Sequence, residues 1–201
     1  MPVSGARIAV VALVLAACRS EPAPPPQRPA APRPASFIDA AHGVRLDPPD
    51  ATWRFLDSLA AAAADPRAVA GLTDGRACVG LIRSEAPPEA GLEATARARV
   101  QSLGFDAPHL SWMEPVYYLG GTAMRFEVSG QREGVPVSMR VTLALAPPDD
   151  PKRRLYEVRA ESGSTDHVAA RRCFDAVTGA FDVVPIPEPA PEAEPEPAPA
   201  P

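Results

Sequence analysis

The residues best able to do chemistry in this chain are three cysteines and three histidines. They are scattered along the sequence and show none of the short spacings that zinc ligands share. We therefore expect no metal site and no cofactor. The sequence also has no phosphate-binding glycine loop and no nucleophile-elbow pattern around its serines. It thus offers no catalytic residue.

One histidine, His109, follows Asp106 closely enough to form an acid–base pair, although an ordinary loop histidine is the simpler interpretation. Trp112, Tyr117 and Tyr118 come soon after it. Aromatic side chains near a hairpin can line a ligand pocket, and strand alternation sends the two tyrosines to opposite faces. The candidate ligand or partner contacts are therefore His109, Trp112, Tyr117 and Tyr118, with core and edge packing as the alternative.

The N-terminus carries a candidate modification site. A ten-residue apolar run, Ile8 to Ala17, follows one positive charge and ends directly before Cys18. Ten residues of helix rise about 15 Å, half the hydrocarbon core of a bilayer, so the run is typical of a signal peptide and not of a membrane span. Leu15-Ala16-Ala17-Cys18 resembles a bacterial lipobox, in which the cysteine is lipidated and the peptide is cleaved just before it.

This resemblance implies a lipoprotein of the cell envelope that is anchored through Cys18, because two or three acyl chains hold a protein firmly at a membrane. In such proteins an aspartate after the cysteine is the signal for retention at the inner membrane. Arg19 stands there instead, which favours the outer membrane, facing the periplasm. An ordinary secretory signal with a chance cysteine is the alternative.

The same compartment bears on the other two cysteines. An oxidising compartment leaves Cys78 and Cys173 free to pair once Cys18 is lipidated. We therefore predict a Cys78–Cys173 disulfide. Two buried free thiols that pack as small apolar groups are the alternative.

Proline usage divides the chain into segments. The 27 prolines are concentrated in residues 18–36, behind the predicted signal peptide 1–17, and in residues 185–201, which also hold four glutamates. Proline fixes φ and removes a hydrogen-bond donor, so both segments are expected to be disordered arms. Residues 37–184 between them are expected to form one globular domain. The net charge of −5 argues against nucleic-acid binding, which needs a clustered basic surface.

Periodicity within the domain predicts helices first and antiparallel strands after them. Apolar residues at three- and four-residue steps predict helices over 50–64 and 89–103, and Asp65-Pro66, a capping residue followed by proline, predicts a short helix over 65–72. Alternation then predicts strands over 110–119, 124–128, 135–145 and 156–160, and a final hairpin from 168–174 and 180–184. The expected fold class is α+β, with N-terminal helices packed on a curved antiparallel sheet of about four to six strands.

The order of these elements resembles two known fold groups. The first helix, with Trp53 and Phe55, and the Asp65-Pro66 pair after it are similar to the opening of the cone-shaped superfamily of nuclear transport factor two and ketosteroid isomerase. That resemblance implies a pocket between the helices and the curved sheet, but no particular activity. Residues 155–158 followed by 174–179 instead resemble the ending of the PepSY or cystatin-like group.

These features predict a non-catalytic envelope lipoprotein whose domain binds a protein partner or a small ligand. Two alternatives stay open. A pocket enzyme, a hydrolase or an isomerase, would gather Asp106, His109 and a tyrosine in one apolar cavity. A structural spacer or assembly element would depend on the two proline-rich arms instead.

Overall fold

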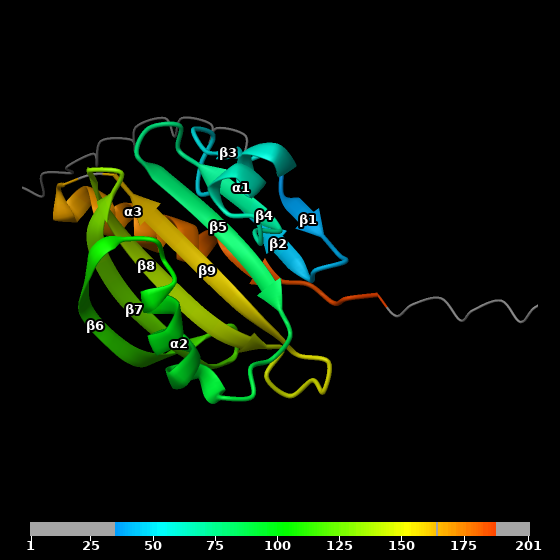
Figure 1. Ribbon diagram of the computed structural model, residues 1–201. Helices are drawn as coiled ribbons and strands as arrows, with labels where there is room; N and C mark the ends of the chain where they lie inside the picture. Colours follow the sequence, from blue (N-terminus) through cyan, green and yellow to red (C-terminus); the bar gives the residue numbers. More distant parts are fainter. Residues whose placement is uncertain (1–34, 164, 188–201) are drawn as a thin grey trace, which may run out of the picture. The chain divides into compact units, whose positions relative to one another are not determined.

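A large antiparallel sheet organises the domain (Figure 1). The computed structural model describes residues 35–163 and 165–187, so Cys18, the predicted signal peptide and most of both proline-rich arms lie outside the described residues. The seven strands are β3 (Arg54–Phe55), β4 (Ala70–Thr73), β5 (Cys78–Glu85), β6 (Asp106–Tyr118), β7 (Gly121–Arg132), β8 (Val135–Ala146) and β9 (Arg154–Ser162). Their order across the sheet is β3-β4-β5-β9-β8-β7-β6.

A small sheet and three helices complete the domain. The small sheet has the order β1-β2-β10, with β1 at Phe37–Asp39, β2 at Val44–Leu46 and β10 at Phe181–Val183. The helices are α1 (Ser58–Ala64), α2 (Gly91–Gln101) and α3 (His167–Ala180). In Figure 1, α2 lies in front of the large sheet and α3 lies behind it. The fold class is therefore α+β, as predicted.

The large sheet exceeds the expected four to six strands because its first strands form where the sequence predicted helices. The helix predicted over 50–64 begins only at α1, where the Asp57 carboxylate accepts a hydrogen bond from the Ala60 N–H at 2.8 Å. The helix predicted over 65–72 is a loop followed by β4, which pairs with β5. Of the three predicted N-terminal helices, the one over 89–103 is present as α2 and covers one face of the sheet, while α3 covers the other face.

The first strand and the turn of the predicted final hairpin are wrong, because residues 167–180 form α3, while the predicted strand over 180–184 is present as β10 and pairs with β2. The Asp166 carboxylate caps this helix by accepting a hydrogen bond from the Val168 N–H at 2.9 Å. One face of α3 packs on the sheet, and its buried residues recur at helical spacing, namely Ala170, Cys173, Phe174, Val177 and Ala180. The helix predicted over 89–103 is confirmed as α2, and the long alternating strands are confirmed as β6 to β8.

The large sheet is covered on both faces, which gives the domain two apolar cores. On one face, Ala96 and Val100 of α2 belong to a cluster with Phe126 of β7. On the other, α3 and the small sheet pack around Tyr156 of β9. Neighbouring residues of β9 consequently serve different cores, since Leu155 belongs to the first and Tyr156 to the second.

Two features bring α3 close to the sheet. A disulfide joins Cys78 of β5 to Cys173 of α3, as the sequence predicts, with Cα atoms 5.5 Å apart and a separation of 95 positions in sequence. Gly80, two residues further along β5, leaves room for the helix, because a Cβ atom there would lie 2.7 Å from a methyl carbon of Val177. The helix thus rests directly on the backbone of β5.

Candidate binding cleft

A cleft of about 500 Å³ opens between the first half of α3 and the strands β6, β7 and β8. It lies on the face of the large sheet that α3 covers. One wall comes from Trp112 and Glu114 of β6, and the opposite wall from His167 and Arg171 of α3. The floor comes from β7 and β8 and includes Arg140.

The register of the sheet places the floor residues in rows. Trp112 of β6 is paired with Glu127 of β7, and Glu127 is paired with Arg140 of β8. Because residues opposite one another on neighbouring strands point to the same face, the three side chains lie in one row across the cleft. Ser129 and Ser138 form the next pair of the β7–β8 ladder on the same face, two residues away from Glu127 and Arg140 along their strands.

Arg140 holds this arrangement together. Its guanidinium donates to one Glu127 oxygen from Nε and Nη2, at 2.8 and 2.6 Å, and to Asp175 of α3 from Nη1, at 2.6 Å. Its Cζ also lies 5.0 Å from the centre of the Phe174 ring and 5.9 Å from that of Trp112. These charge-assisted bonds and cation–π contacts join β6, β7, β8 and α3, so the walls of the cleft are fixed relative to its floor.

Other polar side chains of the cleft form no hydrogen bond or ion pair with the described residues of the protein. Within residues 35–163 and 165–187, no hydrogen bond or ion pair involves the side chains of Ser129 and Ser138, which are partly buried in the floor. The same holds, over those ranges, for Glu114, His167 and Arg171 at the exposed rim. The cleft thus presents hydroxyl, carboxylate and guanidinium groups beside an indole ring, which suits a ligand with both polar and apolar surfaces.

The structure separates the four contact residues predicted from the sequence. Trp112 lines the cleft, but His109 is exposed and does not. Tyr117 is 80% exposed. Tyr118 packs against the core beneath α3 and does not line the cleft, and its hydroxyl donates to the Thr178 carbonyl at 2.7 Å, so it holds the helix to the sheet. Burial raises the pKa of Tyr118 well above that of a free tyrosine.

The predicted acid–base pair is not assembled around the cleft either. Asp106 and His109 both lie on the exposed first part of β6, where a register shift separates them and Ala107 has a φ of +52°. The histidine that does meet a carboxylate is His42, whose Nδ1 lies 2.7 Å from Asp39 in the turn between β1 and β2. The spacing of these two residues, three apart, was the signal available in the sequence.

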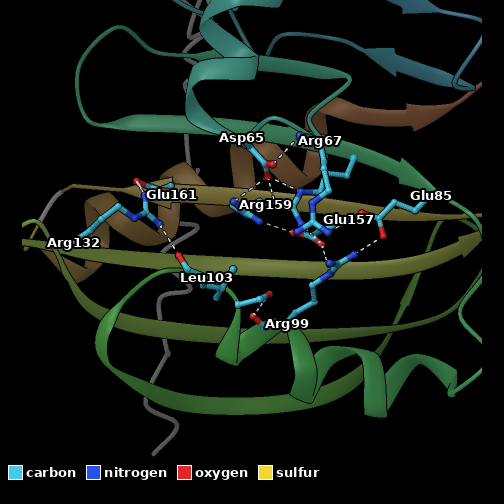
Figure 2. Close-up of polar contacts among 11 residues, drawn as sticks. Asp65, Arg67, Glu85, Arg99, Leu103, Arg132, Glu157, Arg159 and Glu161 are labelled. Atoms are coloured by element: carbon cyan, nitrogen blue, oxygen red, sulfur yellow. Dashed lines mark hydrogen bonds and ion pairs between the residues drawn. The ribbon is translucent and has the colours of Figure 1, made fainter.

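A second polar cluster lies on the opposite face of the large sheet, beside α2 (Figure 2). It joins three arginines and three carboxylates, namely Asp65, Arg83, Glu85, Arg99, Glu157 and Arg159. Glu157 is 1% exposed, and guanidinium groups take both of its oxygens: Arg159 lies 2.8 Å from Oε1, while Arg83 and Arg99 lie 3.3 and 2.7 Å from Oε2. Arg67 adds a fourth guanidinium at the exposed edge of the cluster, 3.8 Å from Glu85, and the cluster holds α2 and the end of α1 to the sheet.

Asp65 is the carboxylate of this cluster that follows α1. Burial alone raises the pKa of Asp65, but the Arg67 backbone N–H, which donates to it at 3.0 Å, and the guanidinium groups of Arg83 and Arg159 lower it by more. The pKa of Asp65 is therefore below its ordinary value, and the group is ionised at neutral pH. A carboxylate held in this way stabilises the fold and is not placed to transfer protons.

Two further properties concern the described part of the chain. Among residues 35–163 and 165–187, no group of three or more histidine, cysteine, aspartate or glutamate side chains could hold a metal ion. None of the three helices there combines the length and the apolar character needed to cross a membrane.

Comparison with known proteins identifies the fold. No protein-family model and no curated protein matches the sequence. The solution structure of cyanobacterial PsbP (CyanoP) from Synechocystis sp. PCC 6803 is similar, with a TM-score of 0.51 and 14% identity over 74% of this chain and 91% of that one. LpqN, involved in cell envelope biogenesis of Mycobacterium tuberculosis, has a TM-score of 0.47 and 11% identity over 71% and 83%. A protein of unknown function from Pseudomonas aeruginosa, PA94, has a TM-score of 0.42 and 15% identity over 78% and 98%.

The likeness to CyanoP shows a shared fold, since identity at this level carries no information about activity. The resemblances to the cone-shaped superfamily and to the PepSY group stay predictions from the sequence.

Proposed function

We propose that this chain is a lipid-anchored protein of the bacterial cell envelope whose domain binds a small ligand or a protein partner in the cleft between α3 and strands β6 to β8. The observation that carries the proposal is the cleft itself. Its floor is fixed by Arg140, yet the side chains of Ser129 and Ser138 beside it are left without protein partners among the described residues. Partly buried polar groups of this kind are satisfied by water or by a bound molecule.

The proposed role is binding without chemistry. Asp106 and His109, the pair that the sequence predicts for acid–base catalysis, lie exposed outside the cleft. Arg140 is the buried cation of the cleft and the side chain best placed to stabilise a developing negative charge. Its N–H groups already donate hydrogen bonds to Glu127 and Asp175. Groups held so firmly are suited to fixing the shape of a site.

The envelope location rests on two independent features of the sequence and the fold. The four residues Leu15 to Cys18 resemble a lipobox. The Cys78–Cys173 disulfide supports an oxidising compartment outside the cytoplasm, where such bonds persist. With Arg19 after the cysteine, the proposed site of attachment is the outer membrane, facing the periplasm.

The anchor is tested by replacing its cysteine. We expect the parent chain to sediment with envelope membranes and the Cys18→Ala variant to move to the soluble fraction, because it lacks the site for the acyl chains. The Cys78→Ser/Cys173→Ser variant is the control, since it keeps Cys18 and should stay with the membranes. Intact-mass analysis should give a chain that begins at Cys18 and carries fatty acids. Unchanged sedimentation of Cys18→Ala would refute the anchor.

The binding role is tested by native mass spectrometry of the purified full-length mature chain after incubation with an envelope extract. We expect a bound species that is retained by the parent and by Tyr117→Ala, and lost by Trp112→Ala. Tyr117 is a suitable control because it lies on the same strand, is exposed and does not line the cleft. Equal retention by both variants, or no bound species at all, would contradict a binding role for the cleft.

A further inference from the structure

We infer that the ligand of the cleft is a saccharide, an inference that rests on the binding function proposed above. The charges that line the cleft argue against a charged ligand. Its lining holds two glutamates, Glu114 and Glu127, and two arginines, Arg140 and Arg171. Glu127 and Arg140 are bonded to each other, which leaves Glu114 and Arg171, one charge of each sign, beside His167, so the lining favours a ligand without net charge.

The floor of the cleft narrows the class further. Ser129 and Ser138 are direct partners in the β7–β8 ladder and both line the cleft. A hydroxyl group both donates and accepts a hydrogen bond, and so does each hydroxyl of a sugar. A lipid chain in the cleft would cover these serines without replacing their bonds to water, which costs free energy. A polyhydroxy ligand replaces those bonds.

The wall formed by β6 supplies the apolar side of the site. Trp112 is partly buried, and the Arg140 guanidinium lies over its ring, with Cζ 5.9 Å from the ring centre. The C–H groups on one face of a pyranose ring can pack against such an indole while the hydroxyl groups at the ring's edge reach toward the floor. Glu114, two residues along the same strand, lies on the same wall and can accept further hydroxyl hydrogen bonds.

The size of the cleft agrees with this class of ligand. Its volume of about 500 Å³ falls within the range of small-molecule sites, roughly 300–1,000 Å³. One or two sugar rings fit such a space.

The experiment uses the intrinsic fluorescence of Trp112. The chain has two tryptophans, so Trp53→Phe leaves Trp112 as the single reporter in the full-length mature protein. This protein is titrated with N,N′-diacetylchitobiose, cellobiose and maltose, and separately with dialanine, inorganic phosphate and choline. We expect a saturable change in the emission of Trp112 with at least one of the disaccharides and none with the other three probes. Isothermal titration calorimetry on the parent chain checks the affinity without the reporter.

Serine variants then connect the binding to the floor of the cleft. Ser129→Ala/Ser138→Ala should weaken disaccharide binding about tenfold or more, because two hydrogen bonds to the ligand are lost. Ser102→Ala is the matched control, since Ser102 lies after α2 on the other side of the sheet and its hydroxyl donates to the Arg99 carbonyl at 3.0 Å. Both changes are small, and unchanged thermal unfolding of each variant ensures that the comparison reports on binding.

The possible outcomes separate this inference from the proposed function. Saturation by dialanine, phosphate or choline in place of the sugars would overturn the saccharide assignment and leave a binding cleft. The assignment also fails if no probe binds while the envelope extract still yields a Trp112-dependent species, or if the serine variants bind sugars as the parent does. If neither the probes nor the extract yields a bound species, both the assignment and the proposed function fail.

Discussion

Asp65 is a buried carboxylate whose ionised form the fold requires. It is 3% exposed and pairs with Arg83 and Arg159, and its pKa is lowered. Since the folded pKa lies below the value of about 3.9 for a free aspartate, the ionised group contributes stability above that pH. This contribution is lost as the pH falls through the folded pKa.

We therefore expect Asp65→Asn to lower the free energy of unfolding at pH 7 by about 3–5 kcal/mol, because it leaves two buried guanidinium groups short of a partner. The difference from the parent should shrink as the pH falls below about 4. Urea unfolding across this pH range measures both effects. Glu93→Gln is the control: its pair with Arg97 is exposed on α2 and should be worth less than about 0.5 kcal/mol. Equal effects of the two substitutions would contradict this account.

Residue types alone could identify only part of the cleft. Trp112 was predicted as a contact because it is a large aromatic residue near a hairpin, and the structure places it in the wall. Arg140 was missed because it alternates with apolar residues along β8, which is the pattern of a strand with one face in solvent. It is in fact 7% exposed, since α3 covers that face.

At the scale of elements, α3 is the helix that the sequence did not predict. Val168 and Phe174 have strand propensity, and the segment 175–179 after them has turn composition, so the sequence predicts a hairpin. The helical spacing of Ala170, Cys173, Phe174 and Val177 was also present, but small residues weaken such a pattern. The sequence could not show the sheet face that makes this spacing decisive. The long strands were predictable because their alternation extends over many residues.

The contact between α3 and β5 gives a prediction at this scale. Gly80→Ala should destabilise the domain by more than about 1 kcal/mol, because a Cβ at that position would lie 2.7 Å from Val177 and 2.9 Å from Leu72. Gly179→Ala is the matched change within α3, where nothing surrounds the added methyl. We expect it to be neutral or to stabilise the helix by up to about 1 kcal/mol. Thermal unfolding of the two variants distinguishes them, and similar midpoints would mean that α3 does not pack closely on β5.

At the scale of the whole molecule, the Cys78–Cys173 disulfide links two parts of the domain that are far apart in sequence. It closes a loop of 95 residues, for which the chain-entropy model gives about 4–5 kcal/mol of stabilisation. We expect Cys78→Ser/Cys173→Ser to lower the free energy of unfolding by up to that amount in urea titrations. Adding reductant should weaken the parent and leave the double variant unchanged.

Thiol counting gives an independent check on the same bond. The Cys18→Ala chain, unfolded without reductant, should contain no reactive thiol, because its remaining two cysteines are paired. Two reactive thiols in that sample would show that the pair is not oxidised in the cell. The full loss of stability would then have to be assigned to packing around the two sulfur atoms.

The small sheet has a consequence for the timing of folding. Its middle strand, β2, is flanked by β1 on one side and by β10 on the other, so Leu46 is paired with both Phe37 and Phe181. Phe37 is close to Leu46 in the sequence, whereas Phe181 is separated from Leu46 by almost the entire domain. While the polypeptide emerges from a ribosome or a translocation channel, one edge of β2 therefore has no partner strand until β10 has been delivered. That edge is paired only when β10 forms, so the small sheet can be completed only after the whole domain has left the ribosome or channel.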